Sequence, residues 1–242
     1  MATISHHWRI SEYLTEKEFH KANELMEKGN FTKAISIFLA KIDELKDNNE
    51  LIKWVAYDLG CIYSMNDDIE NASLFFKKST KLFDGHNSIA YAGVIREYAM
   101  ILKDQKKWSK AIGFYQNAKK IFIKNWINEE SPIDFAVLQT EMADTYRNLG
   151  KLDEALESCL EAKKIMIDNR QVKHYVYAET LNCLGEIHID LNRKNEALPF
   201  FSEALSILNK TEEVILINRL TSNMAKVNDA SFSDRSDAST LL

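Results

Sequence analysis

The sequence predicts an all-α protein built from five helix pairs, on two observations. First, a small residue is followed twelve positions later by alanine at five places, and two helices approach closely only where side chains are small. The five pairs are Ala22/Ala34, Gly60/Ala72, Ala99/Ala111, Ala143/Ala155 and Gly185/Ala197. Second, the 242 residues are 45% hydrophobic but include only seven glycines and two prolines, which leaves little of the turn chemistry that a β-sandwich needs.

Turn and capping residues place the helix ends. The first two helices are predicted over residues 12–28 and 32–46, separated at Gly29. Ser88 is expected to cap the start of a later helix, and Ser131-Pro132 has the order of residues that favours another helix start.

The whole chain is predicted to consist of four parts. Residues 1–11 form an N-terminal extension, and residues 12–210 hold the helical repeats. Residues 211–227 form a capping helix, whose apolar stripe either covers the end of the stack or makes a homodimer. That stripe is Val214, Ile217, Leu220, Met224 and Val227. Residues 228–242 are rich in Ser, Asp and Ala and are expected to be a disordered tail.

The fixed register resembles the tetratricopeptide repeat (TPR), whose pattern is W-x2-L-G-x2-Y followed by A-x3-F. The resemblance is strongest in Leu59-Gly60…Tyr63…Ala72…Phe76 and in Leu184-Gly185…Ala197…Phe201. It implies a right-handed α-solenoid that binds a partner rather than catalysing a reaction. The alanine-to-alanine spacings of 38, 39, 44 and 42 exceed the 34 of the shortest type, as in kinesin light chains, spindle-orientation adaptors and bacterial peptide-pheromone receptors.

The inner surface of such a solenoid would be acidic. Six positions on the first helix of each repeat lie together, opposite the face that packs on the second helix. These thirty positions hold ten acids and three bases, a net charge of −7, whereas the whole chain carries −5. The acidity is therefore concentrated on the predicted inner face.

The predicted groove has an apolar amino-terminal half, with Phe19, Met26, Trp54, Tyr57, Met65 and Met100, and an acidic carboxyl-terminal half. Its expected ligand is a peptide or helix with apolar and Lys/Arg side chains. The candidate partner-binding residues are Phe19, Asn23, Trp54, Tyr57, Asp58, Arg96, Glu97, Met100, Glu141, Asp144, Arg147, Asn182 and Glu186.

Two other binding functions are disfavoured. The chaperone-tail binders of the TPR family hold a carboxylate with Lys, Asn and Arg side chains. Of the corresponding residues here, which include Asp58 and Glu97, only Asn23 matches. The doublets Lys77-Lys78, Lys119-Lys120 and Lys163-Lys164 form a basic stripe on the second helices, but the acidic groove would repel nucleic acid.

Catalysis, cofactors and membrane insertion are not expected. The sequence contains no phosphate-binding loop, no Cys-x-x-Cys and no His-Glu-x-x-His, and His6-His7 lacks a third metal ligand nearby. No apolar run approaches about 20 residues and no secretory signal is visible. Three widely spaced cysteines, Cys61, Cys159 and Cys183, favour reduced thiols and a cytoplasmic location. The alternative function is a peptide-responsive regulator resembling the bacterial Rap-type receptors.

Overall fold

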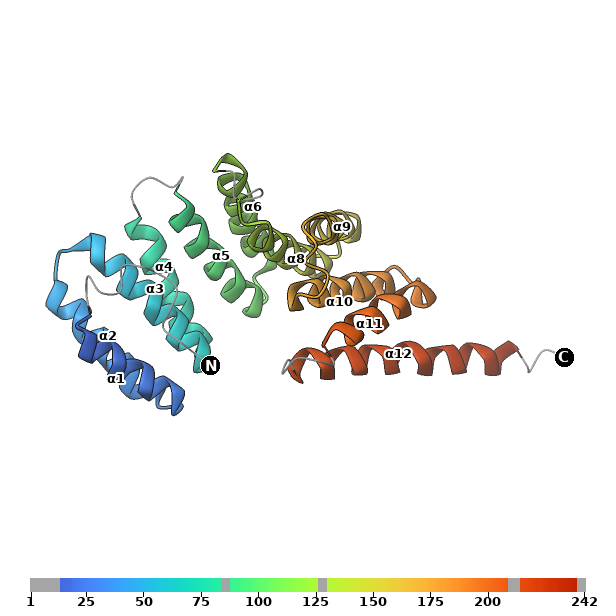
Figure 1. Cartoon of the computed structure of the whole chain (residues 1–242), viewed down its shortest axis with the longest axis horizontal. Helices are drawn as coiled ribbons and strands as arrows, with labels where there is room; N and C mark the ends of the chain where they lie inside the picture. The colour runs from blue at the N-terminus through green and yellow to red at the C-terminus, as the bar shows by residue number, and fades with distance from the viewer. Residues whose placement is uncertain (1–13, 84–87, 126–129, 209–213, 239–242) are drawn as a thin grey trace. The chain divides into compact units, whose positions relative to one another are not determined.

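The computed structural model describes residues 14–83, 88–125, 130–208 and 214–238, with the side chains of all of these except Glu16 and 228–238 (Figure 1). All regular secondary structure in these ranges is helical, which confirms the all-α prediction. The helices are α1 (Glu16–Glu27), α2 (Phe31–Leu45), α3 (Asn49–Met65), α4 (Ile69–Leu82), α5 (Ile89–Asp104), α6 (Trp108–Lys124), α8 (Pro132–Asn148), α9 (Leu152–Asp168), α10 (Tyr175–Asp190), α11 (Lys194–Leu208) and α12 (Val214–Ala238).

Helix α1 begins at Glu16, later than the predicted start at residue 12. Thr15 is its N-cap, and Thr15 and Glu18 form a reciprocal capping box. The backbone N–H of Glu18 donates to Thr15 Oγ1, and the backbone N–H of Thr15 donates to Glu18 Oε2 at 2.8 Å. A Thr-x-x-Glu box fixes the start more sharply than the apolar pattern does. Residues 1–13, including His6-His7, lie outside the described residues.

Other predicted helix ends are confirmed. The Ser88 side chain caps α5 by accepting a hydrogen bond of 3.1 Å from the backbone N–H of Tyr91. Pro132 occupies the first turn of α8, where its missing N–H costs nothing. Gly29 and Gly150 follow α1 and α8 with φ of +70° and +72°, a region that glycine enters without steric cost. Local chain chemistry therefore sets these ends.

The small residues of the repeat register lie at the helix crossings, as predicted. All the alanines of the five pairs are fully buried, and Gly60 and Gly185 are buried as well. The residues four positions after each second alanine are at most 1% exposed: Phe38, Phe76, Tyr115, Cys159 and Phe201. A buried side chain thus follows each second alanine by one turn, and at Gly60 and Gly185 that side chain lies directly against the small residue.

Two crossings are too close for any side chain larger than hydrogen. A Cβ atom built on Gly60 would lie 2.9 Å from the ring of Phe76, and one built on Gly185 would lie 2.3 Å from the ring of Phe201. Both distances are well inside van der Waals contact. Glycine is therefore required at these two positions for the phenylalanine ring to lie flat against the helix backbone.

The chain divides into two compact units, residues 1–121 and 122–242, with the division inside α6. In the first unit each helix from α1 to α5 packs on the next in sequence, and Tyr98 of α5 contacts Phe114 of α6 with ring centroids 5.1 Å apart. In the second unit α8 to α12 pack in the same sequential order, and α10 also contacts α8 and α12. Contacts limited to neighbouring helices are characteristic of repeat proteins.

Helix α12 packs against α11 and α10, as expected of a capping helix, but two details of the prediction were wrong. Leu220 and Val227 of the predicted stripe are buried, and Ile217 and Met224 pack against the same core, but Val214 is exposed and Leu216 and Asn223 are buried in addition. The helix also does not end at residue 227, because it continues to Ala238 through part of the predicted tail. Residues 228–238 contain no glycine or proline to end a helix, which accounts for the extension. Residues 239–242 lie outside the described residues.

Candidate protein-interaction face

Four charged residues of α8 and α10 lie close together in the second unit, and three of them are candidate partner-binding residues. The Arg147 guanidinium on α8 lies 3.2 Å from Asp144 Oδ1 one turn earlier, 3.1 Å from Glu186 Oε2 and 3.1 Å from Asp190 Oδ2 on α10. We call Asp144, Arg147, Glu186 and Asp190 the Arg147 cluster. The register that aligns successive first helices also brings three candidates, Asp144, Arg147 and Glu186, close together.

The Arg147 guanidinium stays charged. Partial burial disfavours the charge on Arg147, but the attraction of Glu186 and Asp144 and the hydrogen bonds to Asp190 and Asp144 outweigh it and raise the pKa of the guanidinium. One guanidinium faces three carboxylates, so the cluster has an excess of negative charge. Asp190 is the most exposed member, with 39% of its side chain accessible.

Helix α12 contributes two residues that the sequence prediction missed. Asn223 Nδ2 donates to Glu186 Oε1 at 2.9 Å and to Asn182 Oδ1 at 3.2 Å, and Arg219 Nε lies 3.8 Å from the Glu186 carboxylate. Asn182 is fully buried by this contact. The expectation that Asn182 lines an open groove was therefore wrong. The signal that could have found Asn223 is a polar residue between Leu220 and Val227 on the core side of an apolar helix.

Two aromatic candidates of the first unit are packing residues rather than an exposed surface. Trp54 is 6% exposed and makes an edge contact with Phe83, with ring centroids 5.2 Å apart. Tyr57 lies edge-on to Phe76 at 5.8 Å, and burial raises the pKa of its hydroxyl. The prediction of open binding aromatics was wrong here, because Phe83 at the end of α4 turns in an extended conformation and covers Trp54.

The polar candidates of the first unit are also largely closed. Asp58 is 3% exposed, so the carboxylate expected to repel a bound carboxylate is buried. Arg96 and Glu97 pair with each other, with Nη2 and Oε1 2.8 Å apart. Of these positions on the first helices of repeats two and three, Asp58 is buried, whereas Arg96 and Glu97 keep about a fifth of their side chains exposed.

The predicted exposure of the methionines and of the first-repeat residues is only partly observed. Met26 is buried and Met100 is half-buried, whereas Met65 is exposed. Phe19 and Asn23 on α1 are half-buried, as is Glu141 on α8. The described residues of the first unit therefore do not form an apolar surface of the predicted extent.

The described residues contain neither a cluster of metal ligands nor a membrane-spanning helix. In residues 14–83, 88–125, 130–208 and 214–238, no three His, Cys, Asp or Glu side chains gather as a metal site would require. Within those ranges, no helix has the length and apolar character needed to span a bilayer. The three cysteines are free thiols, and burial raises the pKa of Cys61 and Cys159.

Comparisons with known proteins agree with this architecture. Residues 134–210 match the tetratricopeptide-repeat family, and residues 20–104 match a domain of unknown function, DUF6340. Among curated proteins, the 43 kDa receptor-associated protein of the synapse from Tetronarce californica is 32% identical over 75 residues. That alignment spans 31% of this chain and only 18% of the relative.

Solved structures share the fold at low sequence identity. BtubC (BKLC) from P. vanneervenii is 20% identical with a TM-score of 0.69 and 82% of each chain covered. The TPR-like repeats of a candidate kinesin light chain from Podosopora anserina are 14% identical, with a TM-score of 0.67 over 81% of this chain and 96% of theirs. YrrB, a TPR protein with an unusual peptide-binding site, is 15% identical with a TM-score of 0.57 over 87% and 93%. Residues 134–210 therefore match the tetratricopeptide-repeat family, and the chain shares the fold of tetratricopeptide-repeat structures.

Proposed function

We propose that this chain is a non-catalytic protein-interaction module, an adaptor or scaffold, that binds a peptide or helix with apolar and Lys/Arg side chains. The Arg147 cluster carries the proposal. Three carboxylates from two helices converge within 3.2 Å of one guanidinium, so they already hold the geometry that an arginine or lysine of a ligand requires. We place this function in the cytoplasm, where Cys61, Cys159 and Cys183 would remain reduced thiols.

The charge on this face supports a basic ligand. The cluster sets the carboxylates of Asp144, Glu186 and Asp190 against the guanidinium groups of Arg147 and Arg219. A basic side chain that pairs with Asp190 meets a carboxylate that is already oriented and partly exposed, so less ordering and desolvation free energy is spent on binding. Complementary charge also speeds association and excludes acidic partners.

The test uses two labelled peptides in fluorescence anisotropy, one repeating Leu-Lys-Ser-Arg and one with each Lys and Arg replaced by Glu. The double variant Asp144→Lys/Asp190→Lys should bind the basic peptide at least about tenfold more weakly than the parent. Glu157→Lys/Asp168→Lys changes the charge equally on exposed sites of α9 and should bind as the parent does. Equal binding of both peptides, or equal weakening by both double variants, would contradict the proposal.

A substitution with the opposite effect sharpens the test. Arg147 occupies the carboxylates that the ligand would use, so Arg147→Gln should strengthen binding of the basic peptide while lowering the thermal stability of the free protein. The basic peptide also tests the alternative function, a peptide-responsive regulator. A change in small-angle scattering that saturates with the basic peptide would favour that alternative over a rigid adaptor.

A further inference from the structure

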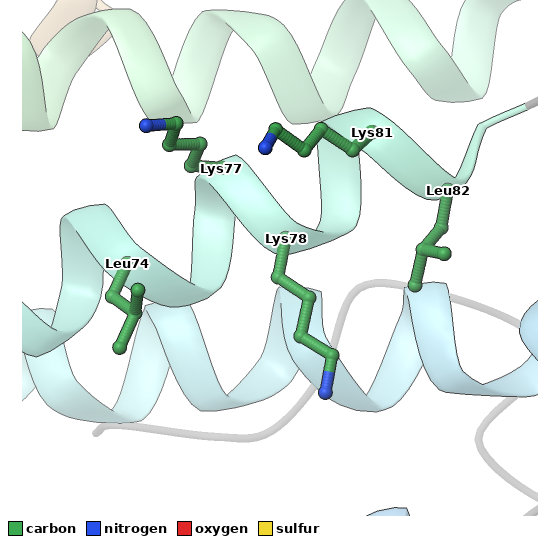
Figure 2. Close-up of a pocket in the computed structure, with 5 residues that line it drawn as sticks. All are labelled: Leu74, Lys77, Lys78, Lys81 and Leu82. Carbon is green, nitrogen blue, oxygen red and sulfur yellow. The ribbon is translucent and has the colours of Figure 1, made fainter. Parts of the chain in front are cut away.

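Helix α4, the second helix of the second pair, carries a pocket that is separate from the Arg147 cluster. Its volume is about 360 Å³, and its described lining consists of Leu74, Lys77, Lys78, Lys81 and Leu82. Figure 2 shows Leu74, Lys78 and Leu82 directed to one side of α4, in a row spaced by four residues. Lys77 and Lys81 form a second row beside it. We call these five residues the α4 pocket.

The three ammonium groups of the α4 pocket are unneutralised. In the described part of the chain, none of them makes an ion pair or a hydrogen bond. Other lysines of the first unit do pair: Lys53 lies 2.7 Å from Glu50, and Lys41 lies 2.9 Å from Glu18. The nearest acid before them on the same helix is Glu70, seven residues before Lys77 and thus beyond the reach of an i,i+4 pair. A local charge of +3 therefore remains available to a ligand.

The apolar part of the α4 pocket is also unused. Leu74 is 58% exposed, the largest exposed fraction among the described leucines. Leu82 is half-buried. An aliphatic group lying against both leucines would remove apolar surface from water. The volume is within the range of about 300–1,000 Å³ that is usual for ligand pockets.

We propose that the α4 pocket docks an acidic segment of a protein partner, with an aliphatic side chain against Leu74 and Leu82 and carboxylates on Lys77, Lys78 and Lys81. The charge complementarity selects the ligand. Among the described residues of the lining there is no aromatic side chain on which a base could stack, which disfavours single-stranded nucleic acid. Its leucines line a hollow rather than project from it, which disfavours insertion into a membrane surface. This site has the opposite charge preference to the Arg147 cluster and lies in the other unit.

The test uses a labelled peptide repeating Glu-Leu-Asp-Ser, titrated against the full chain by fluorescence anisotropy. The variant Lys77→Glu/Lys78→Glu/Lys81→Glu should bind at least about tenfold more weakly than the parent, and it should gain binding to the same peptide with Lys in place of each acid. The matched control is Lys33→Glu/Lys110→Glu/Lys120→Glu, three exposed lysines of α2 and α6 with the same charge change. It should bind the acidic peptide within about twofold of the parent.

Leu74→Ser tests the apolar contact separately. Because Leu74 is largely exposed, the variant should melt as the parent does but bind the acidic peptide about fivefold more weakly. The double variant Asp144→Lys/Asp190→Lys should bind the acidic peptide at least as tightly as the parent, so failure of the α4 pocket and failure of the Arg147 cluster are distinguishable. Equal weakening by the two triple variants would overturn the proposal. Lysine-dependent binding to phosphatidylserine vesicles or to single-stranded DNA, with no binding of the acidic peptide, would overturn it as well.

Discussion

The first helices of the two units use equivalent repeat positions in different ways. In the first unit, Trp54 and Asp58 of α3 are almost completely buried. At the equivalent positions of α8 in the second unit, Val137 and Glu141 are only half-buried. A repeat position therefore indicates which way a side chain points, but the neighbouring helices and loops decide whether it reaches solvent.

The largest expected effect tests whether Trp54 is a packing residue. Trp54→Ala should remove the contacts with Phe83 and Tyr57 and lower the free energy of unfolding by about 3–5 kcal/mol. Met65→Ala is the control, because Met65 is exposed near the end of the same helix, and it should change stability by less than about 0.5 kcal/mol. Denaturant titrations followed by circular dichroism measure both. A Trp54→Ala protein as stable as the parent would restore the prediction of a binding aromatic.

The next effect compares the glycine crossings of the two units. Gly185→Ala and Gly60→Ala should each destabilise the protein by about 1–3 kcal/mol, because the new Cβ atom would press into a buried phenylalanine ring. Gly185→Ala should cost more, since its Cβ atom would lie 2.3 Å from Phe201 against 2.9 Å from Phe76 at Gly60.

Gly113→Ala is the control for this pair. A Cβ atom there meets nothing within 4 Å, and alanine has the better helix propensity, so this variant should gain up to about 1 kcal/mol. Thermal melts that rank the three variants in another order would contradict the close crossings.

A smaller effect compares two carboxylates of the Arg147 cluster, Glu186 and Asp190. Glu186→Ala leaves Asn182 and Asn223 without their shared acceptor and should cost about 1–2 kcal/mol. Asp190→Ala removes an exposed partner of Arg147 and should cost no more than about 1 kcal/mol. Equal costs, measured by urea titration, would show that α12 does not rely on Glu186.

The smallest effect concerns the half-buried ion pair between Glu18 and Lys41 of the first unit. Partial burial favours the neutral form of Glu18, but hydrogen bonds from Lys41 and Thr15 outweigh it and lower the pKa of Glu18. The stability that Glu18 contributes is therefore present above its ordinary pKa and is lost as the pH falls through its lowered pKa. Glu18→Gln should be less stable than the parent at neutral pH, and the difference should shrink in acid. A difference independent of pH would exclude this charge effect.

Much of the fold could be predicted because its determinants are close in sequence. Small residues twelve positions apart, a large side chain four positions later, and caps such as Ser88 act within one helix pair. The start of α1 and the end of α12 were misplaced for the opposite reasons: a strong capping box at Thr15 was overlooked, and a polar composition after residue 227 was taken for disorder.

The candidate site was predicted only in part, because burial depends on contacts between distant residues. The sequence by itself determined the helix register and hence the grouping of Asp144, Arg147 and Glu186. Tertiary structure alone decided that Phe83 covers Trp54, 29 residues away, and that Asn223 closes over Asn182, 41 residues away. Helical periodicity fixes the direction of a side chain on its own helix. It carries no information about which later segment packs over it, since that choice depends on the summed burial and hydrogen bonding of the folded chain.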